Sequence, residues 1–183
     1  MGLWVIEKRV EKMKLTPLHP NQIVTLNDFP VHNEHILKIF FKITKDGYSN
    51  IIPPCPVVHK SLILPFFDKK LSFLFKTFEK THPKAEFFLL DGSHKTTALS
   101  LTGNKIKVMI FENNKDIEEA KKLIDAGELF SLTVDDTIEI NAKELGKHFK
   151  KKSGFQTVEE KTEKMVKAKV IPNYMIKYYK ELR

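Results

Sequence analysis

The chain has 183 residues, a formal net charge of +8 and a hydrophobic fraction of 42%. This length predicts one compact domain with an appendage, and the 14 phenylalanines are enough to fill a real core. A single cysteine excludes a disulfide framework within the chain, and no apolar run approaches the ~20 residues that cross a bilayer, so we expect a cytoplasmic location and no membrane partner.

The first half of the chain predicts helices and strands in alternation. Asn33 is placed to cap a helix that stops at Gly47 and carries an apolar face. Three prolines then predict an extended entry into a strand at Val57-Val58. Pro65 stands where a further helix is expected to start, and apolar residues at helical spacing predict that its stripe packs in the core: Phe67, Leu71, Leu74, Phe75 and Phe78.

Beyond residue 104 the pattern changes from a strand to charged helices. In residues 105–112 the apolar residues Ile106, Val108 and Ile110 stand at every second position, which predicts a half-buried strand. Asn114 is expected to cap a helix over 115–126, which Gly127 ends. Thr137–Ile140 is predicted to be a short strand.

The last part of the chain, residues 141–183, predicts a helical extension. Asn141 is expected to cap a helix that runs to Lys151, and Thr157 with Glu160 has the spacing of a capping box. Pro172 is expected to begin the last helix. This basic extension is either a small DNA-binding appendage or a brace against the sheet, and lysine-rich helix faces are usually only solvated surface.

The most informative stretch is a polar cluster between a predicted strand and a predicted helix. The apolar run Phe87–Leu90 precedes it, and a short helix that stops at Gly103 follows. The cluster consists of Asp91, Gly92, Ser93, His94, Lys95, Thr96 and Thr97. A turn of this kind leaves backbone amides at the positive end of a helix, which suits a phosphate group. The alternative interpretation is an ordinary turn in which Ser93 or Thr96 caps the helix.

The loop is not a Walker A motif. Lys95-Thr96-Thr97 is similar to the end of one, but His94 stands where that motif requires glycine. Zinc is not expected, because the chain has no second cysteine and His32 and His35 lack zincin spacing.

These residues resemble the ParB/sulfiredoxin superfamily. The resemblance rests on Phe88–Lys95, on Ala98-Leu99, on Thr102-Gly103 and on the closing strand Val108–Ile110. It covers about residues 15 to 112, including a first strand near Leu15–Pro20, and implies a helical insertion at about 63–83. The implied fold is α/β (α+β), a mixed sheet flanked by helices. We therefore expect a nucleotide-binding domain at 1–140 and a helical extension at 141–183.

Residues of the loop separate three branches of this superfamily. Sulfiredoxins carry a catalytic cysteine where Ser93 stands here, and a hydroxyl cannot replace thiolate chemistry. The ParB branch binds a nucleotide and DNA. The free serine kinases phosphorylate the amino acid with ADP or ATP, and the segment Ile117–Ser131 is similar to the end of their archaeal members.

The resemblance to the kinases implies a site and a reaction. ATP or ADP with Mg²⁺ would bind through Gly92, Ser93, His94, Lys95, Thr96 and Thr97. Asp91 would hold the metal or orient the acceptor, and His94 and Lys95 would neutralise the transferred group. The acceptor would be a small hydroxylated metabolite, with L-serine as one candidate, and a ParB-like DNA-binding module is the alternative.

Two departures from the kinase pattern concern the acceptor. The kinases carry an acidic residue after the proline near the first strand, whereas Asn21-Gln22 follow Pro20 here. They also carry a basic residue after the serine of the last strand, whereas this chain has Val134–Thr137. The general base and the residue that recognises the acceptor are therefore not identified by the sequence.

Overall fold

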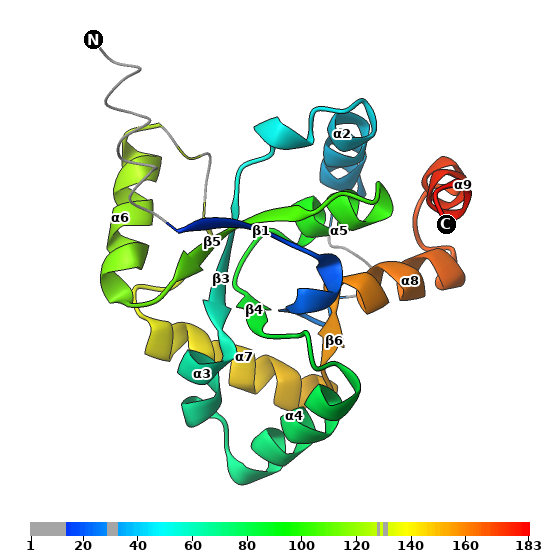
Figure 1. Ribbon diagram of the computed structural model, residues 1–183. Helices are drawn as coiled ribbons and strands as arrows, with labels where there is room; N and C mark the ends of the chain where they lie inside the picture. The colour runs from blue at the N-terminus through cyan, green and yellow to red at the C-terminus, as the bar shows by residue number, and fades with distance from the viewer. Residues whose placement is uncertain (1–13, 29–32, 128, 130–131) are drawn as a thin grey trace.

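The computed structural model describes residues 14–28, 33–127, 129 and 132–183. In this part of the chain a mixed sheet of six strands occupies the centre, in the order β1-β5-β3-β4-β2-β6 (Figure 1). The strands are β1 (Leu15–Leu18), β2 (Ile23–Thr25), β3 (Cys55–His59), β4 (Phe87–Leu89), β5 (Ile106–Phe111) and β6 (Gln156–Thr157). The predicted fold class, α+β with a mixed sheet, is confirmed.

The directions of the strands decide what meets at each end of the sheet. β2 runs parallel to β4, with Ile23 opposite Phe87 and Val24 opposite Phe88. β3 is also parallel to β5, and the remaining pairs are antiparallel. Because β2 and β4 are parallel neighbours, the segments that leave their carboxyl ends start side by side. Ligands commonly bind at that edge of a sheet.

Helices cover both faces of this sheet (Figure 1). Neighbouring strand residues point to opposite faces, so Val58 packs on one side and Val57 on the other. The side of Val58 carries the short helix α3 (Lys60–Ile63) together with α4 (Lys69–Thr81), α6 (Asn114–Asp125) and α7 (Ile138–Lys152). The opposite side carries α2 (Glu34–Lys45), α5 (Ser93–Leu101), α8 (Val158–Ala168) and α9 (Asn173–Glu181).

Phenylalanines dominate the core beneath α4 and α7. Phe75, Phe88 and Phe149 are completely buried, and their rings lie around Phe155 at centroid distances of 4.5 to 6.3 Å. The aromatic stripe predicted on the insertion at 63–83 is therefore a packing face, as expected. Its helix starts later than predicted: Pro65 lies in a 3-10 turn, η3 (Leu64–Phe66), and Asp68 caps α4.

Other predicted boundaries are confirmed or move by one residue. Asn33 caps α2 through its side chain, and Thr157 with Glu160 forms the predicted capping box of α8. The helix assigned to 115–126 begins one residue earlier, because Asn113 rather than Asn114 is its cap. The strands at Val57-Val58 and 105–112 and the last helix after Pro172 are present. The strand at 105–112 is not half-buried as predicted, because helices cover both faces of the sheet: Met109 and Phe111 pack on one side, and Val108 and Ile110 on the other.

The predicted strand at Thr137–Ile140 is wrong. Thr137 is the N-cap of α7, and its side chain accepts a hydrogen bond from the amide of Ile140. Asn141 is therefore not a cap but part of the first turns, where its side-chain amide donates to the carbonyl oxygens of Asp135 and Thr137 at 3.1 and 2.7 Å. Ile138 is buried while Ile140 is 43% exposed, so their spacing does not mark one face of a strand.

Residues after 140 are part of the same packed unit as the sheet. β6 pairs with β2 as the last strand, and α7 buries Leu145 and Phe149 in the core. The boundary expected between 140 and 141 falls inside α7. Among the described residues, no helix has both the length and the apolar character needed to cross a membrane.

Candidate functional site

The predicted loop joins β4 to α5 through a glycine in a left-handed conformation. Gly92 has φ +102° and is the N-cap of α5, to which it offers no side-chain cap. A Cβ atom at this position would lie 2.8 Å from the Cys55 Sγ atom, so the turn requires glycine for two reasons. Burial raises the pKa of the Cys55 thiol to about 11, and the thiol is therefore a packing group rather than a nucleophile.

Lys95 folds back over the start of α5. Its Cε atom lies 3.0 Å from the position that a Gly92 Cβ would occupy, and only 9% of the residue is exposed. Within the described residues Lys95 makes no hydrogen bond or ion pair. A nearly buried ammonium group without a carboxylate is unfavourable unless an anion is supplied. The Lys95 ammonium and the positive end of the α5 dipole therefore both favour an anionic ligand at this turn.

Ser93, the first residue of α5, belongs to a cluster with two residues that are distant in sequence. Its hydroxyl donates to Asp28 Oδ2 at 2.7 Å and accepts from Lys161 Nζ at 2.5 Å. Lys161 also forms an ion pair with Asp28 Oδ1. The Lys161 side chain is 1% exposed and that of Asp28 is 30% exposed. Burial lowers the pKa of the Lys161 ammonium, although the Asp28 carboxylate acts in the opposite direction.

The strand order explains how this cluster assembles. Asp28 lies three residues beyond β2, and Ser93 lies four residues beyond β4, the parallel neighbour of β2. Lys161 lies on α8, which packs against α5. The segment after β2 is also bound to α7, because the Asn27 amide donates to His148 Nε2 at 2.9 Å. Desolvation lowers the pKa of His148, which suits a neutral ring that accepts this bond.

Asp91, the expected metal ligand, is engaged in the turn itself. Its Oδ1 accepts from the Gly92 amide at 2.6 Å, and its Oδ2 accepts from the Thr133 amide at 3.0 Å. Among the described residues no group of three or more His, Cys, Asp or Glu side chains could hold a metal ion. Asp91 fits only as one ligand of a Mg²⁺ ion whose other ligands are phosphate oxygens and water.

The remaining predicted residues divide into reachable and buried groups. His94 is tied to the start of α2, because its Nε2 accepts from the Asn33 amide at 3.0 Å. Thr96 is completely buried, and its hydroxyl donates to the carbonyl oxygens of Gly92 and Ser93, each at 3.1 Å. Thr97 is also completely buried, with no partner for its hydroxyl among the described residues. Ser93 therefore carries the one hydroxyl of the loop that is not fully buried.

Sequence reasoning missed the two residues that contact Ser93. Asp28 carries no local motif, although it follows an apolar strand in the same way as Asp91 does. Lys161 is one lysine among many, and only its complete burial distinguishes it. Gln22, near the position where the kinases carry their acid, instead accepts from the His19 amide at 2.8 Å. Glu128, Phe130 and Ser131 of the kinase-like segment lie outside the described residues.

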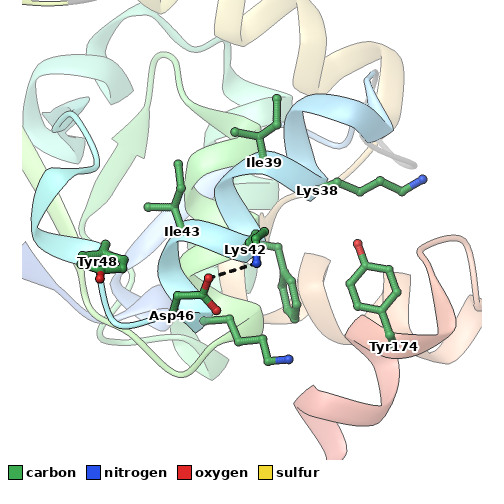
Figure 2. Close-up of a pocket in the computed structure, with 9 residues that line it drawn as sticks. Lys38, Ile39, Lys42, Ile43, Asp46, Tyr48 and Tyr174 are labelled. Atoms are coloured by element: carbon green, nitrogen blue, oxygen red, sulfur yellow. Dashed lines mark ion pairs between the residues drawn. The ribbon is translucent and has the colours of Figure 1, made fainter.

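Apart from the β4–α5 turn, a concave region of about 600 Å³ lies along α2. Figure 2 shows Tyr174 of α9 facing α2 across it, with Lys38 and Lys42 on the α2 side and Asp46 paired with Lys42. Tyr48 and Tyr174 are 59% and 51% exposed. We call this region the α2–α9 groove; its lining also includes Ile39, Phe41, Ile43 and Lys45.

Comparisons with known proteins give no relative. No family model, curated protein or solved structure matches this chain.

Proposed function

We propose that this protein is a nucleotide-binding phosphotransferase of the ParB/sulfiredoxin type, nearest to the free serine kinases. It would transfer a phosphoryl group from ATP or ADP to a small hydroxylated metabolite, with L-serine as one candidate. The observation that carries the proposal is the nearly buried Lys95 ammonium, which has no anionic partner among the described residues, at the uncapped start of α5. Phosphate is the anion that a strand–glycine–helix turn most commonly receives.

Three kinds of group at this turn support the chemistry. The first-turn amides of α5 and the Lys95 ammonium would hold the terminal phosphates and neutralise the charge that develops on them. Mg²⁺ would enter with the nucleotide and take Asp91 as a protein ligand. When bound, the metal would neutralise phosphate charge.

Asp28 is the candidate general base. Its Oδ2 atom accepts a hydrogen bond from the Ser93 hydroxyl at 2.7 Å. A general base must accept the same kind of hydrogen bond from the alcohol that receives the phosphoryl group. Asp28 also supplies the acid that the sequence lacks after Pro20. The ion pair with Lys161 holds the Asp28 carboxylate beside the Ser93 hydroxyl.

Calorimetry tests the phosphate site directly. ATP and ADP would be titrated with Mg²⁺ into the intact chain and into Lys95→Met, which keeps the apolar stem of the side chain and removes the charge. Loss of one charge-assisted phosphate contact should weaken binding about ten- to a hundredfold. Lys105→Met removes an exposed lysine beyond α5 and should bind as tightly as the unmodified chain. Absence of binding to the intact chain at millimolar nucleotide would reject the proposal.

Product formation tests the reaction. Phosphorus NMR of the protein with Mg²⁺, nucleotide and a panel of hydroxylated amino acids and small alcohols should show a new phosphomonoester. Asp28→Asn, which keeps the shape and a hydrogen-bond acceptor, should bind nucleotide and form no product. Product formation by Asp28→Asn at the unmodified rate would show that Asp28 is not the base.

The α2–α9 groove favours a second candidate function, nucleic-acid binding by a ParB-like module. Three lysines and two exposed tyrosines line it, and stacking platforms with cationic groups are typical of nucleic-acid grooves. Fluorescence anisotropy with labelled DNA should then show affinity that falls with salt, at a log–log slope of about −0.9 per duplex phosphate contact. Tyr174→Ala should weaken this binding and leave nucleotide binding unchanged. Tight, salt-dependent DNA binding without any phosphorylated product would favour this function.

A further inference from the structure

The hydroxyl of Ser93 has the surroundings of an activated nucleophile. A serine hydroxyl is a weak nucleophile unless a neighbouring base removes its proton. Here the proton points to the Asp28 carboxylate at 2.7 Å. The Lys161 ammonium, 2.5 Å from the same oxygen, would stabilise the alkoxide that forms.

The position of this hydroxyl is as important as its partners. Ser93 is the first residue of α5, so its oxygen lies at the positive end of the helix beside the amides proposed to hold phosphate. The hydroxyls of Thr96 and Thr97 on the same helix are completely buried, whereas Ser93 is partly exposed. Of these three hydroxyl-bearing residues, Ser93 is therefore the one that a ligand at the start of α5 could reach.

A purely structural role explains the cluster less well. An ion pair between Lys161 and Asp28 would be complete without a hydroxyl between the two groups. Ser93 instead accepts from one member and donates to the other, so that both charged groups act on a single oxygen. The Lys95 ammonium, which has no hydrogen-bond or ion-pair partner among the described residues, lies two residues further along the same helix and would supply the counter-charge for a phosphoryl group.

We propose that Ser93 itself accepts the terminal phosphoryl group of the bound nucleotide, so that the protein forms a phosphoserine at the start of α5. The Ser93 Oγ atom forms a bond to the terminal phosphorus, and the bond from that phosphorus to the bridging oxygen of the nucleotide breaks. The proton of the hydroxyl passes to Asp28, and a nucleotide shorter by one phosphate leaves. This inference rests on the proposed function, because the nucleotide is the phosphoryl donor.

The sequence around Ser93 allows an unambiguous test. The full chain would be incubated with Mg²⁺ and ATP labelled in its terminal phosphate, and the label located by trypsin digestion and mass spectrometry. Cleavage after Lys84 and Lys95 releases Ala85–Lys95, in which Ser93 is the one hydroxyl-bearing residue. We expect an acid-stable phosphoryl group on this peptide. An acid-labile label would place the phosphate on His94 or Asp91 and overturn the proposal.

Matched variants separate this proposal from the function on which it rests. Ser93→Ala should lose all label, whereas Ser100→Ala on the same helix should bind nucleotide in calorimetry and be labelled like the unmodified chain. Asp28→Asn should bind nucleotide and remain unlabelled. Nucleotide binding without label in the intact chain would overturn the phosphoserine alone. Absence of nucleotide binding would overturn both this proposal and the proposed function.

Discussion

Replacement of Asp28 by alanine should destabilise the protein more than replacement of its partner Lys161 by methionine. The reason is the unequal burial of the two charges: the Lys161 side chain is 1% exposed, and that of Asp28 is 30% exposed. In Asp28→Ala the ammonium group stays in the core, and the Ser93 hydroxyl is the acceptor left to it among the described residues. In Lys161→Met the carboxylate still reaches water and still accepts from Ser93.

The size of the effect follows from the chemistry of a buried amine. Breaking a buried ion pair by removing one partner costs about 3–5 kcal/mol. The amine can also lose its proton, which from an ordinary pKa of 10.5 costs about 5 kcal/mol at pH 7 and sets an upper limit. We expect about 3–5 kcal/mol for Asp28→Ala and about 1–2 kcal/mol for Lys161→Met. The double variant should be more stable than Asp28→Ala, because it leaves no charge behind.

The pH dependence has a definite sign. Desolvation lowers the pKa of Lys161 in the folded protein, so the unfolded chain binds more protons between that lowered pKa and 10.5. Stability should therefore rise with pH in this window. The Asp28 carboxylate raises the pKa of Lys161, so its removal should lower that pKa further and extend the window to lower pH. Within the window the free energy of unfolding should rise by up to about 1.4 kcal/mol per pH unit.

Urea unfolding of the four proteins, followed by circular dichroism over a pH series, measures all these quantities. The unmodified chain and the double variant serve as controls for the slope. If Asp28→Ala lowers the free energy of unfolding by less than about 1 kcal/mol, or if Lys161→Met is the less stable of the two single variants, Lys161 is not a buried ammonium that depends on the Asp28 carboxylate.

Three further predictions concern the turn and the last strand. Gly92→Ala should lower the free energy of unfolding in urea by at least about 2 kcal/mol, because alanine is strained in the left-handed conformation and its Cβ would collide with Cys55. Part of this loss should disappear in a Cys55→Ala background, and equal losses in both backgrounds would contradict the contact. With its pKa raised to about 11, the Cys55 thiol should resist a thiol reagent at neutral pH until urea unfolds the protein, and rapid labelling of the folded chain would contradict its burial. Thr157→Ala should cost about 1 kcal/mol by removing the cap of α8, whereas Thr157→Ser should cost little.

The sequence predicts those parts of the fold whose signals are local. The cap at Asn33 and the capping box at Thr157 and Glu160 each need a few adjacent residues, and both are confirmed. The failure at Thr137–Ile140 has the same origin, because a cap followed by Ile-Glu-Ile satisfies the local pattern of a strand and of a helix start. The side-chain bonds of Asn141 to the residues before it select the helix.

The candidate site was only half predictable for a related reason. Gly92, Ser93 and Lys95 are consecutive or nearly so, and their turn can be read from the order strand, glycine and helix. Asp28 is 65 residues from Ser93, and Lys161 is 133 residues from Asp28. Their meeting depends on the parallel pairing of β2 with β4 and on the packing of α8, neither of which a local pattern specifies.

That separation along the chain has a consequence for the order in which the molecule matures on the ribosome. A chain made from its amino end exposes β2, β4 and the start of α5 long before α8 emerges. During that interval Asp28 has no counter-ion from Lys161, and β2 lacks its neighbour β6. The ammonium that completes the Ser93 cluster arrives only after residue 161 has been synthesised, so nascent chains should lack the complete Asp28–Ser93–Lys161 cluster until α8 docks.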